Sequence, residues 1–256
     1  MKFRVFFALI CGLSLFGCAS SRKKSVDDLS ARERSSLYLN IANGSLVEQD
    51  PTGALMHLQK AEKEDPTFAQ VHHVKALAYY AKHDLGAAIE SARKALSIEP
   101  KFSAARTTLA KLLLDQKKYD EAIEVVLPAS KDLLYRNSYK AKTILGMAYY
   151  HKKIYKDSLT AFNAAILEKP EHACVAHFFR GTIRFRLKKY LLAEKDFKKS
   201  IQNNCSSFAK AHFALGMTLK KTNKTKEAKL KFIEIQQLFP DSQFAKKAMK
   251  EVSLLP

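Results

Sequence analysis

The sequence predicts an all-α fold: a solenoid of six helix pairs followed by a C-terminal capping helix. Two periodic features predict it. A small residue recurs every 34 to 36 positions and is followed 12 positions later by a second one, and most units end on a proline. Periods of this length are typical of stacked helical repeats, in which neighbouring units bury one continuous core. The six recurring residues are Ala42, Ala76, Ala110, Gly146, Gly181 and Gly216.

Each unit is interpreted as helix A, a short turn, helix B and a stop. We expect small residues where helix A crosses helix B, because larger side chains would hold the two backbones apart. Proline stops helix B because it lacks an N–H and disfavours helical geometry in the residue before it. In helix B the small residues are Ala54, Ala88, Ala122, Ser158, Ala193 and Ala228, then Ala61, Ala95, Ala129, Ala165 and Ser200, and the stops are Pro66, Pro100, Pro170 and Pro240.

This pattern of small and bulky positions resembles the tetratricopeptide repeat (TPR). Unit two carries it as Ala76, Tyr79, Ala88, Ala92, Ala95 and Pro100, and unit four as Gly146, Tyr149, Ser158, Phe162, Ala165 and Pro170. The resemblance implies a right-handed superhelix that spans residues 31–256. Its repeats are expected near 35–68, 69–102, 103–138, 139–173, 174–208 and 209–242, with a capping helix over 243–252.

The N-terminus resembles a lipoprotein signal peptide over residues 1–17. A basic start with Lys2 and Arg4 precedes an apolar run over residues 5–16, which is too short to span a bilayer as a permanent helix. The Leu-Phe-Gly-Cys ending resembles a bacterial lipobox, which implies cleavage before Cys18 and acylation of that cysteine. Ordinary cleavage and an uncleaved anchor are the alternatives.

Acylation would make attachment to a membrane essentially permanent. Ala19 follows Cys18, and no aspartate stands there. By resemblance to Gram-negative lipoproteins, this implies a chain anchored in the outer membrane and facing the periplasm. Residues 18–30 would then be the lipidated cysteine and a flexible linker.

Cys174 and Cys205 are the cysteines that remain once Cys11 leaves with the signal peptide and Cys18 is lipidated. In an oxidising compartment they are candidates for a disulfide, provided that the connection between helix B and the next helix A folds back over unit five. Two buried free thiols are the alternative. A zinc site that includes His177 and His212 is disfavoured, because both histidines fall on a repeat position that packs between helices. We therefore expect no metal and no cofactor.

The chain is strongly basic, with a formal net charge of +19, or +17 once Lys2 and Arg4 are removed with the signal peptide. An exported protein does not meet nucleic acid, so no nucleic-acid partner is expected. The excess gathers at the turns between helices A and B, and stacking would align it into one basic edge. Two interpretations stay open: a solvated rim, or a surface for anionic headgroups or an acidic partner. The residues are Lys117, Lys118, Lys152, Lys153, Lys188, Lys189, Lys220, Lys221, Lys224 and Lys226.

The concave face of a TPR array is lined by helix A, and its positions here carry many aromatic, Met and Arg residues. These residue types are enriched at the centres of protein interfaces. They predict a groove for a peptide or a partner helix, although some could pack between units instead. The candidate groove residues are His73, Leu77, Tyr80, Lys111, Leu114, Met147, Tyr150, Phe178, Phe185, Arg186, Phe213 and Met217.

Unit three breaks the rhythm. Pro128 lies inside its helix B, where we expect it to kink the helix or end it early. The junction over residues 130–138 carries two extra residues and a Leu134–Tyr135 pair. This layout is similar to that of the type IV pilus pilotin lipoproteins. The resemblance implies an outer-membrane lipoprotein that helps secretin subunits to insert and multimerise.

No enzyme signature competes with this interpretation. The chain lacks a Gly-rich phosphate loop, a Gly-x-Ser-x-Gly motif and a His-Glu-x-x-His motif. We therefore expect no catalytic residues and no small-molecule substrate, a monomer, and a protein partner, either a secretin subunit or another envelope protein. The alternative functions are a periplasmic TPR scaffold that tethers cell-envelope or cell-wall machinery, and a regulator that binds a short secreted peptide.

Overall fold

The computed structural model describes residues 28–202 and 205–255, which form thirteen α-helices and no strand. The predicted signal peptide and Cys18 lie outside these residues. Ser30 and Glu33 form a reciprocal capping box at the start of the first helix, which therefore begins earlier than the unit start expected near Ser35. The helices are α1 (Ala31–Val47), α2 (Pro51–Glu64), α3 (Ala69–Ala81), α4 (Leu85–Ile98), α5 (Ser103–Asp115), α6 (Tyr119–Lys131), α7 (Ser138–His151), α8 (Tyr155–Glu168), α9 (Cys174–Arg186), α10 (Tyr190–Lys199), α11 (Ala209–Lys221), α12 (Thr225–Leu238) and α13 (Gln243–Ser253).

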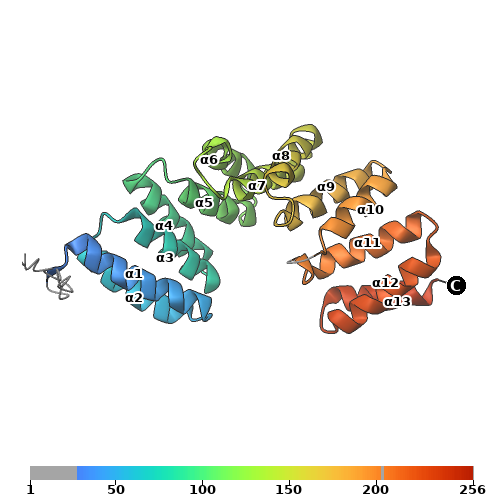
Figure 1. Cartoon of the computed structure of the whole chain (residues 1–256), viewed down its shortest axis with the longest axis horizontal. Helices are drawn as coiled ribbons and strands as arrows, with labels where there is room; N and C mark the ends of the chain where they lie inside the picture. The colour runs from blue at the N-terminus through green and yellow to red at the C-terminus, as the bar shows by residue number, and fades with distance from the viewer. Residues whose placement is uncertain (1–27, 203–204, 256) are drawn as a thin grey trace, which may run out of the picture.

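The helix pairs follow one another in an arc from α1 to α13 (Figure 1). Each odd-numbered helix contacts its even-numbered partner and also the next odd-numbered helix, whereas the even-numbered helices make at most marginal contact with each other. The odd-numbered helices are therefore more closely spaced. They line the inner side of the solenoid, and the predicted all-α solenoid of six pairs with a cap is confirmed.

Helices A and B cross at the small residues, and the side chain that faces each small residue is larger where that residue is glycine. A Cβ atom added to Gly146 would lie 2.6 Å from Cε1 of Phe162, and one added to Gly216 would lie 2.6 Å from Cε1 of Phe232. Where the small residue is alanine instead, the facing side chain is smaller. The glycine pairs are Gly146 with Phe162, Gly181 with Phe197 and Gly216 with Phe232, and the positions that match them in the repeat register of the first three units are Ala42 and Leu58, Ala76 and Ala92, and Ala110 and Val126.

Each turn between helices A and B contains one non-glycine residue with positive φ. In the α3–α4 turn the His83 N–H donates to the carbonyl of Tyr80 and the Asp84 N–H donates to the carbonyl of Tyr79. This is the hydrogen-bond pattern of a Schellman motif, which closes helix A and reverses the chain. All six turns therefore lie at one edge of the solenoid. The residues with positive φ are Gln49, His83, Lys117, Lys153, Lys188 and Asn223.

The caps that start helix B differ along the array. The side chains of Asp50 and Asp84 cap α2 and α4 by accepting from the N–H groups of Gly53 and Ala87, both at 2.9 Å. The last four B helices make no such side-chain bond, a loss of about 1 kcal/mol each relative to a good cap. Their N-cap residues are Lys118, Ile154, Lys189 and Lys224.

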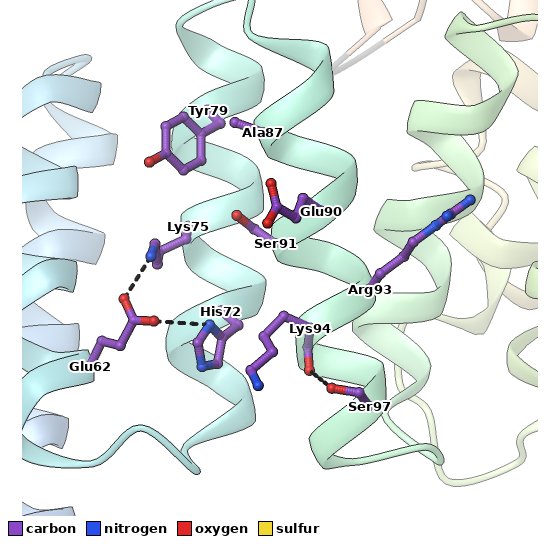
Figure 2. A pocket seen from close by; sticks show the side chains of 10 residues that line it. All are labelled: Glu62, His72, Lys75, Tyr79, Ala87, Glu90, Ser91, Arg93, Lys94 and Ser97. Atoms are coloured by element: carbon purple, nitrogen blue, oxygen red, sulfur yellow. Dashed lines mark hydrogen bonds and ion pairs between the residues drawn. The ribbon is translucent and has the colours of Figure 1, made fainter.

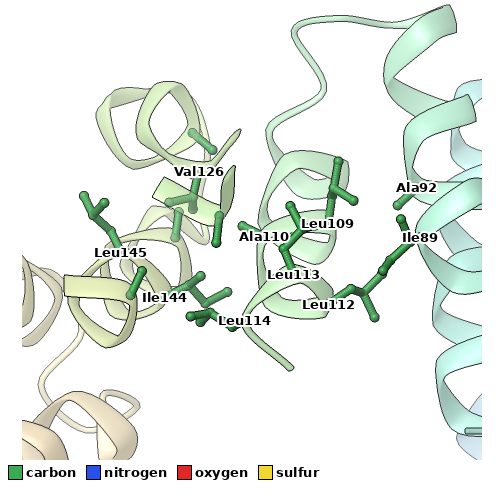
Figure 3. Packing of buried hydrophobic residues seen from close by; sticks show 14 of the residues in the cluster. Ile89, Ala92, Leu109, Ala110, Leu112, Leu113, Leu114, Val126, Ile144 and Leu145 are labelled. Carbon is green, nitrogen blue, oxygen red and sulfur yellow. The ribbon is translucent and has the colours of Figure 1, made fainter. Parts of the chain in front are cut away.

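The core runs through the array from one helix pair to the next. Its central cluster links α4, α5, α6 and α7, with Leu109, Leu112 and Leu113 of α5 between Ile89 and the α6–α7 pair (Figure 3). Because each pair is buried only by its neighbours, stability depends on stacking, as in other repeat proteins.

Two expectations about where helix B ends were wrong. The helix α6 continues through Pro128 to Lys131, because the proline lies in its last turn while Val126 and Ala129 remain buried against the core. In unit five, α10 ends at Lys199, before Ser200. The buried Ser200 hydroxyl donates to the carbonyl of Phe197 at 2.8 Å, and Cys205 lies in the connection to α11.

Among the described residues, no helix combines the length and the apolar character needed to cross a membrane.

Candidate partner-binding groove

The structure places all the predicted groove residues on the odd-numbered helices from α3 to α11. Leu77 and Tyr80 are 37% and 40% exposed on the inner side, and Arg186 is exposed as well. Leu114 and Phe178 are only 7% and 4% exposed. The expectation that Leu114 faces a partner was therefore wrong, because it packs in the core cluster between α5 and α7. Phe178 lies at the floor of the groove.

The N-terminal part of the groove is polar. The Tyr80 hydroxyl donates to Asp115 Oδ2 at 2.9 Å, and the Lys111 ammonium donates to the Asp115 carboxylate at 2.6 Å and to the Tyr80 hydroxyl at 3.2 Å. Burial tends to lower the pKa of Lys111, but the bonds to Asp115 and Tyr80 outweigh it and raise this pKa. The three side chains therefore hold one another between α3 and α5.

His73 lies beside this polar cluster. Its ring nitrogen Nε2 lies 2.9 Å from Thr108 Oγ1, and its ring meets Phe102 edge-on at 5.1 Å between centroids. Burial lowers the pKa of His73 to about 4, so the imidazole is neutral at physiological pH. His73 therefore contributes shape and a hydrogen-bonding group to the groove but no charge.

The middle of the groove is aromatic. The Tyr150 ring meets Phe179 edge-on at 5.0 Å between centroids, and the Arg186 guanidinium lies 5.6 Å from the Tyr150 centroid. Burial raises the pKa of Tyr150. Nearby, Met147 and Lys111 line a hollow of about 330 Å³ with Ile144 and Val175. The pairing of Arg186 with Tyr150 places a cation at the boundary to the next unit.

The C-terminal part contains an apolar pocket of about 340 Å³ between α9, α11 and α13. Five of the predicted groove residues meet there, and two cations, Arg186 and Lys210, stand among the lining residues. The Lys210 ammonium lies 5.3 Å from the Phe178 centroid. The lining residues are Phe178, Thr182, Phe185, Arg186, Phe197, Lys210, Phe213, Ala214, Met217 and Phe244.

The sequence interpretation missed Lys210 and Phe244 in this pocket. Both occupy the second position of a helix A: Lys210 in α11, and Phe244 in α13 if the repeat register is continued into the capping helix. That position is among those that line the groove of TPR arrays. Continuing the register by one more helix would have found Phe244.

A second hollow, of about 650 Å³, lies between α2, α3 and α4 and is polar. Figure 2 shows Glu62 facing both Lys75, whose ammonium lies 2.6 Å from the Glu62 carboxylate, and the Nδ1 atom of the buried His72, at 3.8 Å. His72 Nε2 lies 3.1 Å from the carbonyl of Pro66. The side chains facing Glu62 therefore already serve the packing of α2 on α3.

No three His, Cys, Asp or Glu side chains of the described residues are grouped so that they could hold a metal ion. His177 and His212 are 5% and 3% exposed and pack within the helix layers. A disulfide joins Cys174 and Cys205, with 5.7 Å between their Cα atoms. It connects the first residue of α9 to the segment that precedes α11, so it joins the two helices that form most of the apolar pocket.

Comparison of the sequence with known protein families identifies the type of repeat. Two tetratricopeptide-repeat profiles match, over residues 79–133 and 107–173. The chain carries tetratricopeptide repeats. This TPR protein is 26% identical over 155 residues to the type IV pilus assembly protein PilF of Pseudomonas aeruginosa, a match that covers 60% of this chain and 62% of PilF.

Solved structures share the fold. The structure of Pseudomonas aeruginosa PilF superimposes with a TM-score of 0.75 at 20% identity and covers 86% of this TPR protein and 99% of PilF. PilW, a type IV pilus biogenesis factor, gives 0.75 at 19% identity, covering 85% and 99% of the two chains. MamA from Desulfovibrio magneticus RS-1 gives 0.56 at 22% identity, covering 66% and 94%. At these identities the likeness establishes the fold alone.

Proposed function

We propose that this TPR protein is an outer-membrane lipoprotein that binds a protein partner in its groove and assists the multimerisation of an outer-membrane secretin in type IV pilus biogenesis. The observation that carries the proposal is an apolar pocket, flanked by Arg186 and Lys210, on the inner side of a TPR array related in sequence to PilF. The residue pattern at Cys18 supports lipid attachment, and the net charge of +19 is compatible with an exported chain.

The pocket is suited to an apolar anchor from a partner. Clustered phenylalanine and methionine side chains give a large desolvated contact, and such central pockets hold most of the binding energy of protein interfaces. Arg186 and Lys210 favour a segment with an acidic group beside the apolar side chain. No charged side chain of the described residues other than these two lines the pocket.

Deleting the gene, or replacing Cys18 with alanine, is expected to abolish heat-resistant secretin multimers while secretin monomers persist. The reason is that an assembly factor must meet the secretin at the membrane where the channel forms. The measurement is immunoblotting of the type IV pilus secretin from envelope fractions heated in SDS, with unheated samples alongside. Cys11→Ala is the matched control, since Ile10 precedes Cys11 and the lipobox pattern does not include it.

Undiminished multimers in the deletion strain would contradict the secretin role. A second measurement is a pull-down of envelope proteins with the purified chain. If the secretin is absent from the captured proteins as well, the remaining function is a periplasmic scaffold for envelope or cell-wall machinery. If Cys18→Ala leaves the protein in the membrane fraction, the lipid anchor is wrong, whatever the result with secretin.

Replacing Phe185 and Phe213 together with alanine is expected to weaken binding of the secretin subunit at least tenfold. Each truncation at an interface centre costs about 1–3 kcal/mol, and 1.4 kcal/mol is a factor of ten in affinity. Both side chains are half-buried, so thermal unfolding must be compared to show that the fold persists. Leu230→Ala, 67% exposed on the outer helix α12, is the control. Equal affinity of the folded double variant would place the partner elsewhere.

A further inference from the structure

The edge formed by the turns between helices A and B is strongly basic in the last four units. Of the lysines predicted at this edge, Lys117, Lys118, Lys152, Lys153, Lys188, Lys189 and Lys224 lie in the turns and Lys226 in the first turn of α12, and these eight residues are the basic edge; Lys220 and Lys221 end α11, where Lys220 pairs with Glu251. The loops at the opposite edge of the solenoid, in the described residues, mix both signs: Asp65, Glu99, Lys101, Asp132, Arg136, Lys169, Glu171 and Asp241. In the segments between helices the positive excess therefore lies at the edge of the A–B turns, while Asp120, Glu121, Asp157 and Glu227 stand in the first turns of the helices that follow.

The basic edge is placed where it weakens the fold. The first two B helices begin at Asp50 and Asp84, whose side chains cap the helix. At the same position α6, α10 and α12 carry Lys118, Lys189 and Lys224, with no side-chain cap bond. A cation at a helix N-terminus is also repelled by the helix dipole. Residues that lower stability at a regular surface position indicate a function other than folding.

Most of these ammonium groups have no carboxylate partner. Lys152 pairs with Asp120, and Lys224 lies 2.9 Å from a Glu194 carboxylate oxygen. The side chains of the other basic-edge lysines form no ion pair with another described residue: these are Lys117, Lys118, Lys153, Lys188, Lys189 and Lys226. Their charge is available to an external anion.

Apolar side chains project between the lysines. Ile154, Leu187 and Leu191 are 37%, 51% and 74% exposed at the same turns. Lysines interleaved with exposed aliphatic residues are typical of surfaces that lie on an anionic membrane, where the cations meet headgroups and the apolar groups enter the acyl boundary. A fluid headgroup layer can meet charges spread over four successive units, whereas an acidic protein would need a matching rigid spacing.

We propose that the basic edge of units three to six docks the solenoid on an anionic bilayer surface. Each lysine near such a surface strengthens binding about fivefold at moderate ionic strength. The inference requires neither the lipid anchor nor the secretin role. Where the anchor is present, the edge sets which side of the array faces the membrane and leaves the groove on an adjoining face open to a partner.

The test uses residues 28–256, which contain every described helix. This fragment is sedimented with vesicles of equal parts phosphatidylglycerol and phosphatidylcholine, and with vesicles of phosphatidylcholine alone. We expect at least tenfold tighter binding to the anionic vesicles, which decreases as salt is added. The affinity of the variant Lys118→Asp/Lys189→Asp for anionic vesicles should be at least about 30-fold lower. Its melting temperature should rise, because both aspartates supply helix caps.

Lys101→Asp/Arg136→Asp makes the same change of charge at the opposite edge and should retain the affinity. The proposal is overturned by equal binding to both vesicle types, by a folded Lys118→Asp/Lys189→Asp variant that binds as well as the parent, or by binding to polyglutamate without binding to either vesicle. The last result would assign the edge to an acidic protein. None of these outcomes bears on secretin multimers, and loss of the secretin role would leave vesicle binding unchanged.

Discussion

Replacing Asp196 with alanine is expected to lower the free energy of unfolding by about 3–5 kcal/mol at neutral pH. The Asp196 side chain is 1% exposed, and its carboxylate lies 2.6 Å from Arg180 Nη2 and 2.8 Å from Arg184 Nη1. Removing the carboxylate leaves two guanidinium groups close together without a carboxylate partner, and breaking a buried pair from one side has this cost. Chemical denaturation followed by circular dichroism measures it.

The same site should show a defined pH dependence. Burial acts to raise the pKa of Asp196, but the contact with His177 and the hydrogen bonds and charges of Arg180 and Arg184 outweigh it and hold this pKa below its usual value. The stabilisation is therefore present above the pKa of an unfolded aspartate, near 4, and is lost as pH falls through the lower folded pKa. Asp196→Ala should lose this part of the acid sensitivity.

A control replaces the whole ionic cluster with the residues of unit four. Leu145, Tyr149 and Ala161 stand where unit five has Arg180, Arg184 and Asp196. Exchange of all partners for apolar side chains is often neutral or stabilising, so the variant Arg180→Leu/Arg184→Tyr/Asp196→Ala should regain most of the lost stability. A triple variant as unstable as Asp196→Ala would contradict this explanation.

Replacing Gly146 with alanine is expected to destabilise the protein by about 1–3 kcal/mol, the usual cost of overpacking a core. In most helices this exchange is favourable by about 1 kcal/mol, since alanine is the better helix former. Here the new Cβ atom would lie 2.6 Å from the ring of Phe162, which is fully buried and has no room to retreat. Thermal and denaturant unfolding of the variant test the sign of the effect.

A double-mutant cycle assigns this effect to the ring. Phe162→Leu alone leaves a cavity, but Gly146→Ala/Phe162→Leu recreates the Ala42–Leu58 pair of unit one and should be more stable than the sum of the single changes predicts. Gly44→Ala, in α1, is the matched control, because nothing lies within 4 Å of the added Cβ and the exchange should stabilise. Additive effects in the cycle would show that Phe162 is not responsible.

The periodicity of small residues was sufficient to predict the helix pairs and the groove helices. It succeeded because each small residue meets one defined neighbour across the A–B crossing, so a local sequence feature fixes a local contact. The periodicity did not distinguish side chains that are buried in the core from side chains that are exposed in the groove. Leu77 of α3 and Leu114 of α5 were both predicted to line the groove, yet Leu114 is buried in the core cluster and Leu77 is 37% exposed.

The irregular parts depended on contacts between units. The helix α10 ends at Lys199, where the Ser200 hydroxyl donates to the Phe197 carbonyl. The connection that follows contains Cys205 and is fixed by the disulfide. Neither feature recurs in the other units. Likewise, Asp196 follows the register of Ala161, and nothing in the spacing indicates that two arginines of α9 converge on it. Features that only one unit possesses cannot be predicted from what all units share.

The disulfide restrains the separation of α9 and α11 at one end of the apolar pocket and leaves the other end unrestrained. It joins α9 and α11 where both helices begin, beside Phe178 and Phe213, while Phe185 and Met217 lie further along the same helices toward the turns. The bond limits the separation of α9 and α11 at this end, so a partner can move these two helices apart more readily at the end near the turns. Reduction of the disulfide would remove this restraint. The separation of α9 and α11 at the pocket would then vary more, while the helices themselves would remain folded.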